Sequence, residues 1–588
     1  MGDGSEAYGV SLCKGCDWLA EIQQAPRLTL LSLVVAAAVS LIVLWVYRLR
    51  VLRSLRARDE SAPDTLPPGE GASTGSQRAG PPVSWSTLVS DAVTHRKALT
   101  RLYVLGGLAL CVALAFVDAV ANSGMSRPSA WRLAFAAVAC SLPLPITIRL
   151  LQGRWKPALV VAGVQYVALA VLGRFWPHLP DDSMEQAFGT ALLLAALMHP
   201  RVRAMGILAA AFFTVVFVGA FTSVLVALQF MQADIEANIL ADPRTTALVD
   251  QLSQRVTDPL RLAALGPDLQ TYATDHAVFV LQRIALLALV GTAVSLVLGG
   301  LLFARVAAAY RRKRVSDQWL LVGSVWLFFA FAVASVHSPI GVVGNILAVG
   351  VFTLVVRIGW SRVPCHSGRC VRLLLLRSFL LGERSNRLFQ QLETLWRCVG
   401  SVQLVGSVDL ALTTLEPHEL LDFLRGRGSR EFVHSAAAVD QRLATFDHDR
   451  DPDGRYRVNV LFCRGDATWK HAVGRLLRES DCVLMDLRGF SRHRAGCVFE
   501  VRSLAELSQP RVVFLVDAVT DLDFVRETWS SGRAPGHAGS AGAEGLRFVS
   551  EEPAETVSER IMVALSSESE APDDGATMSA PVLEGPVA

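Results

Sequence analysis

The first 360 residues contain a series of long apolar runs with few charged side chains, and these runs constrain the fold more than any other feature. About 20 apolar helical residues cross the roughly 30 Å hydrocarbon core of a bilayer, so such runs predict membrane spans. The runs cover residues 28–47, 102–121, 133–148, 157–176, 187–198, 204–231, 277–303, 319–336 and 340–356. The sequence therefore predicts a polytopic α-helical membrane protein with about nine spans, of which the fifth is short enough to suit a re-entrant segment.

The positions of Arg and Lys predict the orientation of these spans, because short cytoplasmic loops carry an excess of both. Basic clusters follow alternate runs, with five residues between 48 and 58, five between 305 and 314, and four between 357 and 372. We therefore expect the N-terminus outside and the C-terminus in the cytoplasm. Five of the 56 basic residues are Lys, a bias that suggests a bacterial protein in the cell membrane. The net charge of +3 argues against a nucleic-acid partner.

Composition shifts divide the chain into segments. Residues 61–82 are rich in Pro, Gly and Ser, which predicts a linker, and the first run is an anchor rather than a signal peptide because its Arg cluster follows it. The predicted segments are an extracytoplasmic N-terminus (1–27), an anchor (28–47), a flexible cytoplasmic linker (48–100), a helical bundle (101–357) with an outer loop (232–276), a cytosolic α/β domain (365–565) and a disordered acidic tail (566–588).

Ionisable residues are rare within the runs. Asp118 and Arg283 are the clearest, and they support a transport pathway only as a minor alternative. Cys13 and Cys16 have the spacing of a redox or metal pair, but no further ligand residues lie nearby. We interpret them as an incidental pair or a labile disulfide, and we predict no metal site.

After residue 357, strand and helix patterns alternate at short intervals. This alternation requires crossover connections, so it predicts a mostly parallel five-stranded sheet with helices on both faces. The expected strands cover residues 371–379, 402–408, 456–463, 482–486 and 512–516.

Polar residues follow several of these strands. Ligands of an open parallel sheet bind beyond the carboxyl ends of the strands, where Arg377, Ser378, Asp486 and Arg488 are expected. Arg side chains bind phosphate and Asp accepts hydrogen bonds from ribose hydroxyls, so the set suits a nucleotide. Equally, these residues could cap helices and pair with one another.

One region resembles the strand, loop and WCxxE helix start of TIR domains. It consists of the segment from Asp481 to Asp486, a polar loop and then Gly496-Cys497-Val498-Phe499-Glu500. Leu376-Arg377-Ser378-Phe379 resembles the first-strand motif of the same family. The resemblance implies a flavodoxin-like α/β fold and a catalytic role for Glu500 in NAD cleavage, with NAD or a related nucleotide as ligand and no required cofactor. The alternative for Glu500 is a first-turn acid favoured by the helix dipole, and we interpret Cys497 as a packing residue.

Asp449, Asp451, Asp453 and Gly454 imitate the start of an EF-hand calcium loop. Val460 stands where the bidentate Glu is needed, and three arginines lie within or beside the loop. We therefore predict a solvated turn.

Taken together, these patterns predict a membrane-tethered signalling or effector protein whose TIR-like domain binds, and in one version hydrolyses, a nucleotide such as NAD. The expected partners are the lipid bilayer and, in self-association, a second cytosolic domain. A non-enzymatic scaffold that docks a partner and a transporter with a regulatory domain are the alternatives.

Overall fold

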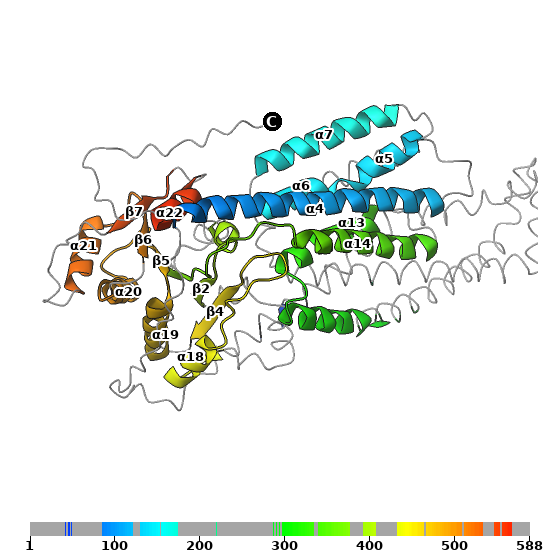
Figure 1. Cartoon of the computed structure of the whole chain (residues 1–588). Coiled ribbons are helices and arrows are strands. Elements are labelled where there is room, and N and C mark those ends of the chain that lie inside the picture. Colours follow the sequence, from blue (N-terminus) through cyan, green and yellow to red (C-terminus); the bar gives the residue numbers. More distant parts are fainter. Residues whose placement is uncertain are drawn as a thin grey trace, which may run out of the picture.

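The computed structural model describes residues 85–121, 130–152, 155–174, 297–333, 339–376, 392–406, 432–463, 466–507, 511–532, 546–552 and 556–566, with a few single helical positions elsewhere. The predicted anchor, the fifth and sixth spans, most of the seventh, the outer loop and both terminal segments lie outside the described residues. Figure 1 shows a helical bundle joined to an α/β domain.

Four helical stretches in the described part of the chain are long and apolar enough to cross a membrane. They are Thr87–Val117, Leu133–Gln152, Lys156–Arg174 and Val343–Trp360. A fifth apolar helix, α13 (Asp317–Val333), has an apolar stretch only from Asp317 to Ala330, which is short for a span. The prediction of nine spans is therefore wrong for the described residues, which supply four.

The second of these stretches is two helices, α5 (Ala130–Cys140) and α6 (Pro143–Gln152). Proline has no backbone N–H and clashes with the preceding turn, so Pro143 ends the continuous helix. Pro145 has no N–H to donate to the Ser141 carbonyl, which instead accepts from the Leu144 N–H at 2.9 Å and from Nε2 of Gln165 of α7 (Trp155–Arg174) at 2.6 Å. A buried amide thus satisfies the backbone at a position where water is scarce.

Small residues bring the bundle helices close together. A Cβ on Gly107 of α4 (Trp85–Ala121) would lie 2.3 Å from the Trp326 ring. One on Gly359 of α14 (Pro339–Trp360) would lie 2.0 Å from Leu102. Helix association in a bilayer depends on such close packing, because lipid tails are as apolar as the helices themselves.

The α/β domain contains a seven-stranded sheet in the order β3-β4-β2-β1-β5-β6-β7, in which every pair is parallel. The strands are β1 (Leu373–Leu376), β2 (Val402–Gly406), β3 (Phe432–Val433), β4 (Val458–Cys463), β5 (Cys482–Asp486), β6 (Arg511–Val516) and β7 (Arg547–Ser550). The prediction of five strands is wrong: it missed β3 and β7, whose two and four residues are too short to show a strand period.

Two apolar cores cover the two faces of this sheet. Leu374 and Leu376 pack on one face with α18 (Ala436–Leu443), α19 (Asp466–Glu479), α20 (Ala495–Ala505) and α21 (Leu522–Ser531). Leu373 and Leu375 pack on the other face with α22 (Val557–Ser566) and with Leu88 and Ala92 of α4.

The start of α4 is therefore part of the α/β core. The linker predicted over residues 48–100 differs from the structure over 85–100, where the chain is helical and Leu88 is fully buried. At a rise of 1.5 Å per residue, the 37 residues of α4 extend about 55 Å, well beyond the hydrocarbon core. One uninterrupted helix is thus part of both the α/β domain and the bundle (Figure 1).

Candidate functional site

The strand order places a switch point between β1 and β5, because the chain continues from β1 to β2 on one side and later adds β5 on the other. In open parallel sheets, ligands bind beyond the carboxyl ends of the strands at such a point. Asp486 ends β5 there. Of the other three residues predicted for this site, Arg377 and Ser378 lie outside the described residues, and Arg488 lies beside Asp486.

Asp486 and Arg488 bind each other. Arg488 donates from Nε to Asp486 Oδ1 at 2.8 Å and from Nη2 to Oδ2 at 2.7 Å, and its Nη1 lies 2.7 Å from Glu551 Oε1. Asp486 is 1% exposed and Arg488 is fully buried. Because Glu551 follows β7, Arg488 links the carboxyl ends of β5 and β7, and a ligand anion at Arg488 would have to replace one of these carboxylates.

Glu500 is a buried carboxyl group on α20. It is 4% exposed, and burial raises its pKa to about 8. Burial is the cause of the shift, with no compensating counter-charge among the described residues, so the neutral form of the carboxyl group is favoured near pH 7. α20 begins at Ala495, which places Glu500 beyond the first turn and weakens the helix-dipole alternative.

The thiol of Cys497 lies near both carboxyl groups of this edge. Burial, followed by the charge of Glu500 and more weakly that of Asp486, raises the pKa of Cys497 to about 12. The thiol therefore stays protonated, whereas a nucleophilic cysteine must form a thiolate, and we interpret Cys497 as a packing residue.

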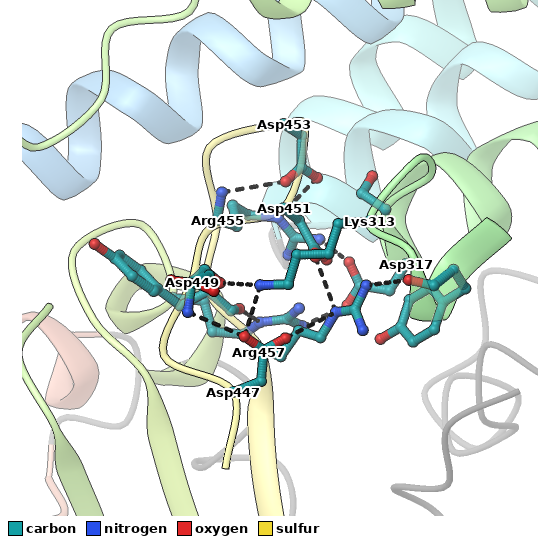
Figure 2. A network of polar contacts seen from close by, with 12 residues as sticks. Lys313, Asp317, Asp447, Asp449, Asp451, Asp453, Arg455 and Arg457 are labelled. Carbon is teal, nitrogen blue, oxygen red and sulfur yellow. Dashed lines mark hydrogen bonds and ion pairs between the residues drawn. The ribbon is translucent and has the colours of Figure 1, made fainter. Parts of the chain in front are cut away.

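A second polar cluster, shown in Figure 2, lies at the amino edge of the sheet, where the domain meets the bundle. We call it the junction network. Its members are Lys313, Asp317, Glu393, Arg397, Asp447, Asp451, Asp453, Arg455 and Arg457.

Asp317, the first residue of α13, connects the bundle to two arginines of the α/β domain. Its Oδ2 lies 2.5 Å from Arg397 Nη1, and its Oδ1 accepts from Arg455 Nη2. Arg455 also pairs with Asp453 at 3.2 Å, and Arg397 pairs with Glu393 at 3.1 Å. The guanidinium groups are thus shared between carboxylates of both parts of the protein.

Lys313 and Tyr310 of the bundle bind the segment of residues 447–457, which we call the junction loop. Lys313 Nζ donates to Asp447 Oδ1 at 2.6 Å and to the Asp449 carbonyl at 2.5 Å. Arg457 donates to the Tyr310 carbonyl at 2.6 Å and lies over the Tyr310 ring, 3.8 Å from its centre. Lys313 has a φ of +53°, an uncommon conformation for a lysine, and these contacts hold it there.

Three buried carboxylates face three buried guanidinium groups in the network. Asp317, Asp451 and Asp453 are 7%, 4% and 0% exposed, and Arg397, Arg455 and Arg457 are 5%, 4% and 4% exposed. A buried pair survives only if its charges and hydrogen bonds are matched, and removing one partner is costly.

The junction loop corrects one prediction. The prediction of a solvated turn over Asp449–Gly454 is wrong, because Asp451, Asp453 and Gly454 are buried. Gly454 adopts a φ of +83°, and His95 of α4 approaches the Asp453 carbonyl at 3.0 Å. Arg455 and Arg457, which would repel a calcium ion, are instead the cations that Asp453 and Asp451 bind. Three Arg beside four Asp in residues 447–457 are the sequence signal for this pairing.

No family model, curated protein or solved structure matches the chain. The fold and the two polar clusters therefore carry the functional argument by themselves.

Proposed function

We propose that the protein is a membrane signalling protein in which the bundle and the α/β domain act as one mechanical unit. The junction network carries this proposal. A domain that only needed tethering would require a flexible linker, whereas this one shares α4 with the bundle, and its buried Arg397 and Arg455 both pair with Asp317 of α13.

The two edges of the sheet suit different tasks. The amino edge contacts the bundle through the junction loop, which leads into β4 at Val458. The carboxyl edge, with its switch point, lies at the opposite ends of the strands. We propose that the amino edge receives a change in the bundle and that the carboxyl edge responds by altering its affinity for a ligand or partner.

For that response, the candidate ligand is a nucleotide such as NAD, bound between the ends of β1 and β5 beside Asp486 and Arg488. Hydrolysis of NAD would break the bond between ribose and nicotinamide, with its electron pair leaving on nicotinamide, while water adds to the ribose carbon and loses a proton. A carboxylate at Glu500 would stabilise the positive charge that develops on the ribose.

The buried state of Glu500 adds a condition to this chemistry. A neutral carboxyl group cannot stabilise a cation, so a cationic nicotinamide would first have to lower the pKa of Glu500 from about 8. Binding of NAD at this site should therefore release a proton near neutral pH.

The proposed setting is a bacterial cell membrane with the N-terminus outside and the α/β domain in the cytoplasm. The bilayer is the main partner, self-association of the α/β domain is a second, and nucleic acid is not expected.

The test uses the full chain in lipid nanodiscs of two bilayer thicknesses. Hydrogen exchange across α20 and the carboxyl edge should differ between the two bilayers in the wild type and much less in Asp317→Asn. Identical exchange in both bilayers would reject the mechanical coupling.

The ligand is tested on the same preparation by calorimetry in two buffers of different ionisation enthalpy and by NAD turnover. Glu500→Gln should retain binding, lose the proton release and lower turnover by orders of magnitude. If NAD neither binds nor is cleaved, even at high protein concentration, the carboxyl edge is better assigned to docking a protein partner.

A further inference from the structure

The junction loop contains a carboxylate with one oxygen in use and one without a partner. Asp451 Oδ1 lies 2.8 Å from Arg457 Nε, while Asp451 Oδ2 is buried and has no hydrogen-bond partner in the described part of the chain. A buried carboxylate oxygen without a donor is costly, and a proton on that oxygen removes the charge that makes it so.

We propose that Asp451 Oδ2 is a proton-binding site and that closure of the junction loop onto the bundle takes up one proton there. The inference concerns the junction alone and does not require a nucleotide or any response at the carboxyl edge.

The surrounding charges decide whether the proton is tolerated. Burial, together with the carboxylates of Asp317 and Asp453, opposes the ionised form of Asp451 more strongly than Arg457 and Arg397 favour it, so the pKa of Asp451 is raised to about 7. The charged and titratable groups around Asp451 come from the loop itself, from the rest of the α/β domain, from the bundle and from α4. They are Asp447, His448, Asp449, Arg450, Asp453, Arg455, Tyr456 and Arg457 of the loop, Glu393 and Arg397 of the α/β domain, Tyr310, Lys313 and Asp317 of the bundle, and His95 of α4.

Arg457 keeps other partners when Asp451 is neutral. It donates to the Tyr310 carbonyl, lies over the Tyr310 ring and has Asp447 Oδ2 at 3.8 Å. Protonation of Asp451 therefore leaves no stranded cation, which is the usual reason that a buried pair cannot lose one charge.

The sign of the pH dependence follows from the open loop, where Asp451 in water has an ordinary pKa near 4. Between that value and about 7 the closed loop holds one more proton than the open loop, so closure weakens as the pH rises and becomes independent of pH above about 7. Burial lowers the pKa of His448, so its titration would have the opposite sign.

The experiment is hydrogen exchange of the full chain in nanodiscs from pH 5 to 8, corrected for the intrinsic exchange rate. The closed loop protects the Asp451 and Gly454 amides, which donate to the Arg455 and Asp451 carbonyls at 2.7 and 2.8 Å. In the wild type, their protection should fall by up to about tenfold per pH unit below pH 7 and then level off. Asp451→Asn, which mimics the protonated form, should keep the loop closed and remove the slope.

Asp449→Asn is the matched control, because Asp449 lies two residues away with an exposed side chain, and it should keep the wild-type slope. A wild-type protection that does not change with pH overturns the proposal, whatever the variants do. A slope that persists in Asp451→Asn overturns it as well, because the titrating group then lies elsewhere.

Discussion

Replacing Asp317 with asparagine tests whether the junction network holds the bundle and the α/β domain together. Asparagine keeps the shape of the side chain but removes the charge that faces Arg397 and Arg455. Both guanidinium groups are buried, with 7% and 4% of the side chain exposed, so neither can recover the lost interaction from water.

The expected cost follows from what each arginine retains. Removing one partner of a buried ion pair costs about 3–5 kcal/mol. Arg455 keeps Asp453 at 3.2 Å, while Arg397 keeps Glu393 at 3.1 Å and the Tyr456 carbonyl at 2.6 Å. We therefore expect the lower end, about 3 kcal/mol, which corresponds to a fall in Tm of roughly 6–12 °C for a unit of 150–250 residues.

The assay is thermal unfolding of the full chain in one detergent, with Asp523→Asn as control. The Asp523 side chain is 94% exposed and pairs with Arg526 on the surface, so its loss should shift Tm by less than about 2 °C. If Asp317→Asn has the same Tm as the control variant, the network does not stabilise the junction.

Two further predictions concern the core and the carboxyl edge. Leu88→Ala should lower the free energy of unfolding by about 2–5 kcal/mol, measured by chemical denaturation of the full chain, whereas a residue in a flexible linker would cost almost nothing. Glu500→Gln should become more stable relative to the wild type as the pH rises from 5, with the difference in Tm levelling off above about pH 8, because the folded wild type must then ionise a buried carboxyl group. A difference that is constant with pH would show that Glu500 titrates normally.

The sequence predicted the elements that have a long and clear pattern. The apolar runs at 102–121, 157–176 and 340–356 fall on α4, α7 and α14, and the five predicted strands fall on β1, β2, β4, β5 and β6. The helical runs are 17 to 20 residues long, and the five strands stand out as short apolar runs between helical patterns.

The errors occur where distant parts of the chain determine the structure. Leu88 and Ala92 come shortly after a segment with the composition of a linker, and their packing against β1 and α22 makes them core residues. Asp451 and Arg457 have the composition of a solvated turn, and their burial depends on residues far back in the chain such as Tyr310, whose carbonyl accepts from Arg457. The sequence around each of these residues does not contain the distant residues that bury it, so local patterns cannot predict the burial.

The junction also limits the kind of motion that a signal can use. Separating the α/β domain from the bundle would remove Leu88 from the apolar core and break both buried ion pairs of Asp317, and each of these losses is costly. Exchange of partners within the network is much cheaper, because Arg457 and Asp317 each already contact more than one group. The junction loop leads directly into β4, and the register runs from Val458 to Val402, from Val402 to Leu373 and from Leu373 to Cys482 of β5. A small shift of the loop would therefore move strands that end at the switch point, without any release of the domain from the membrane.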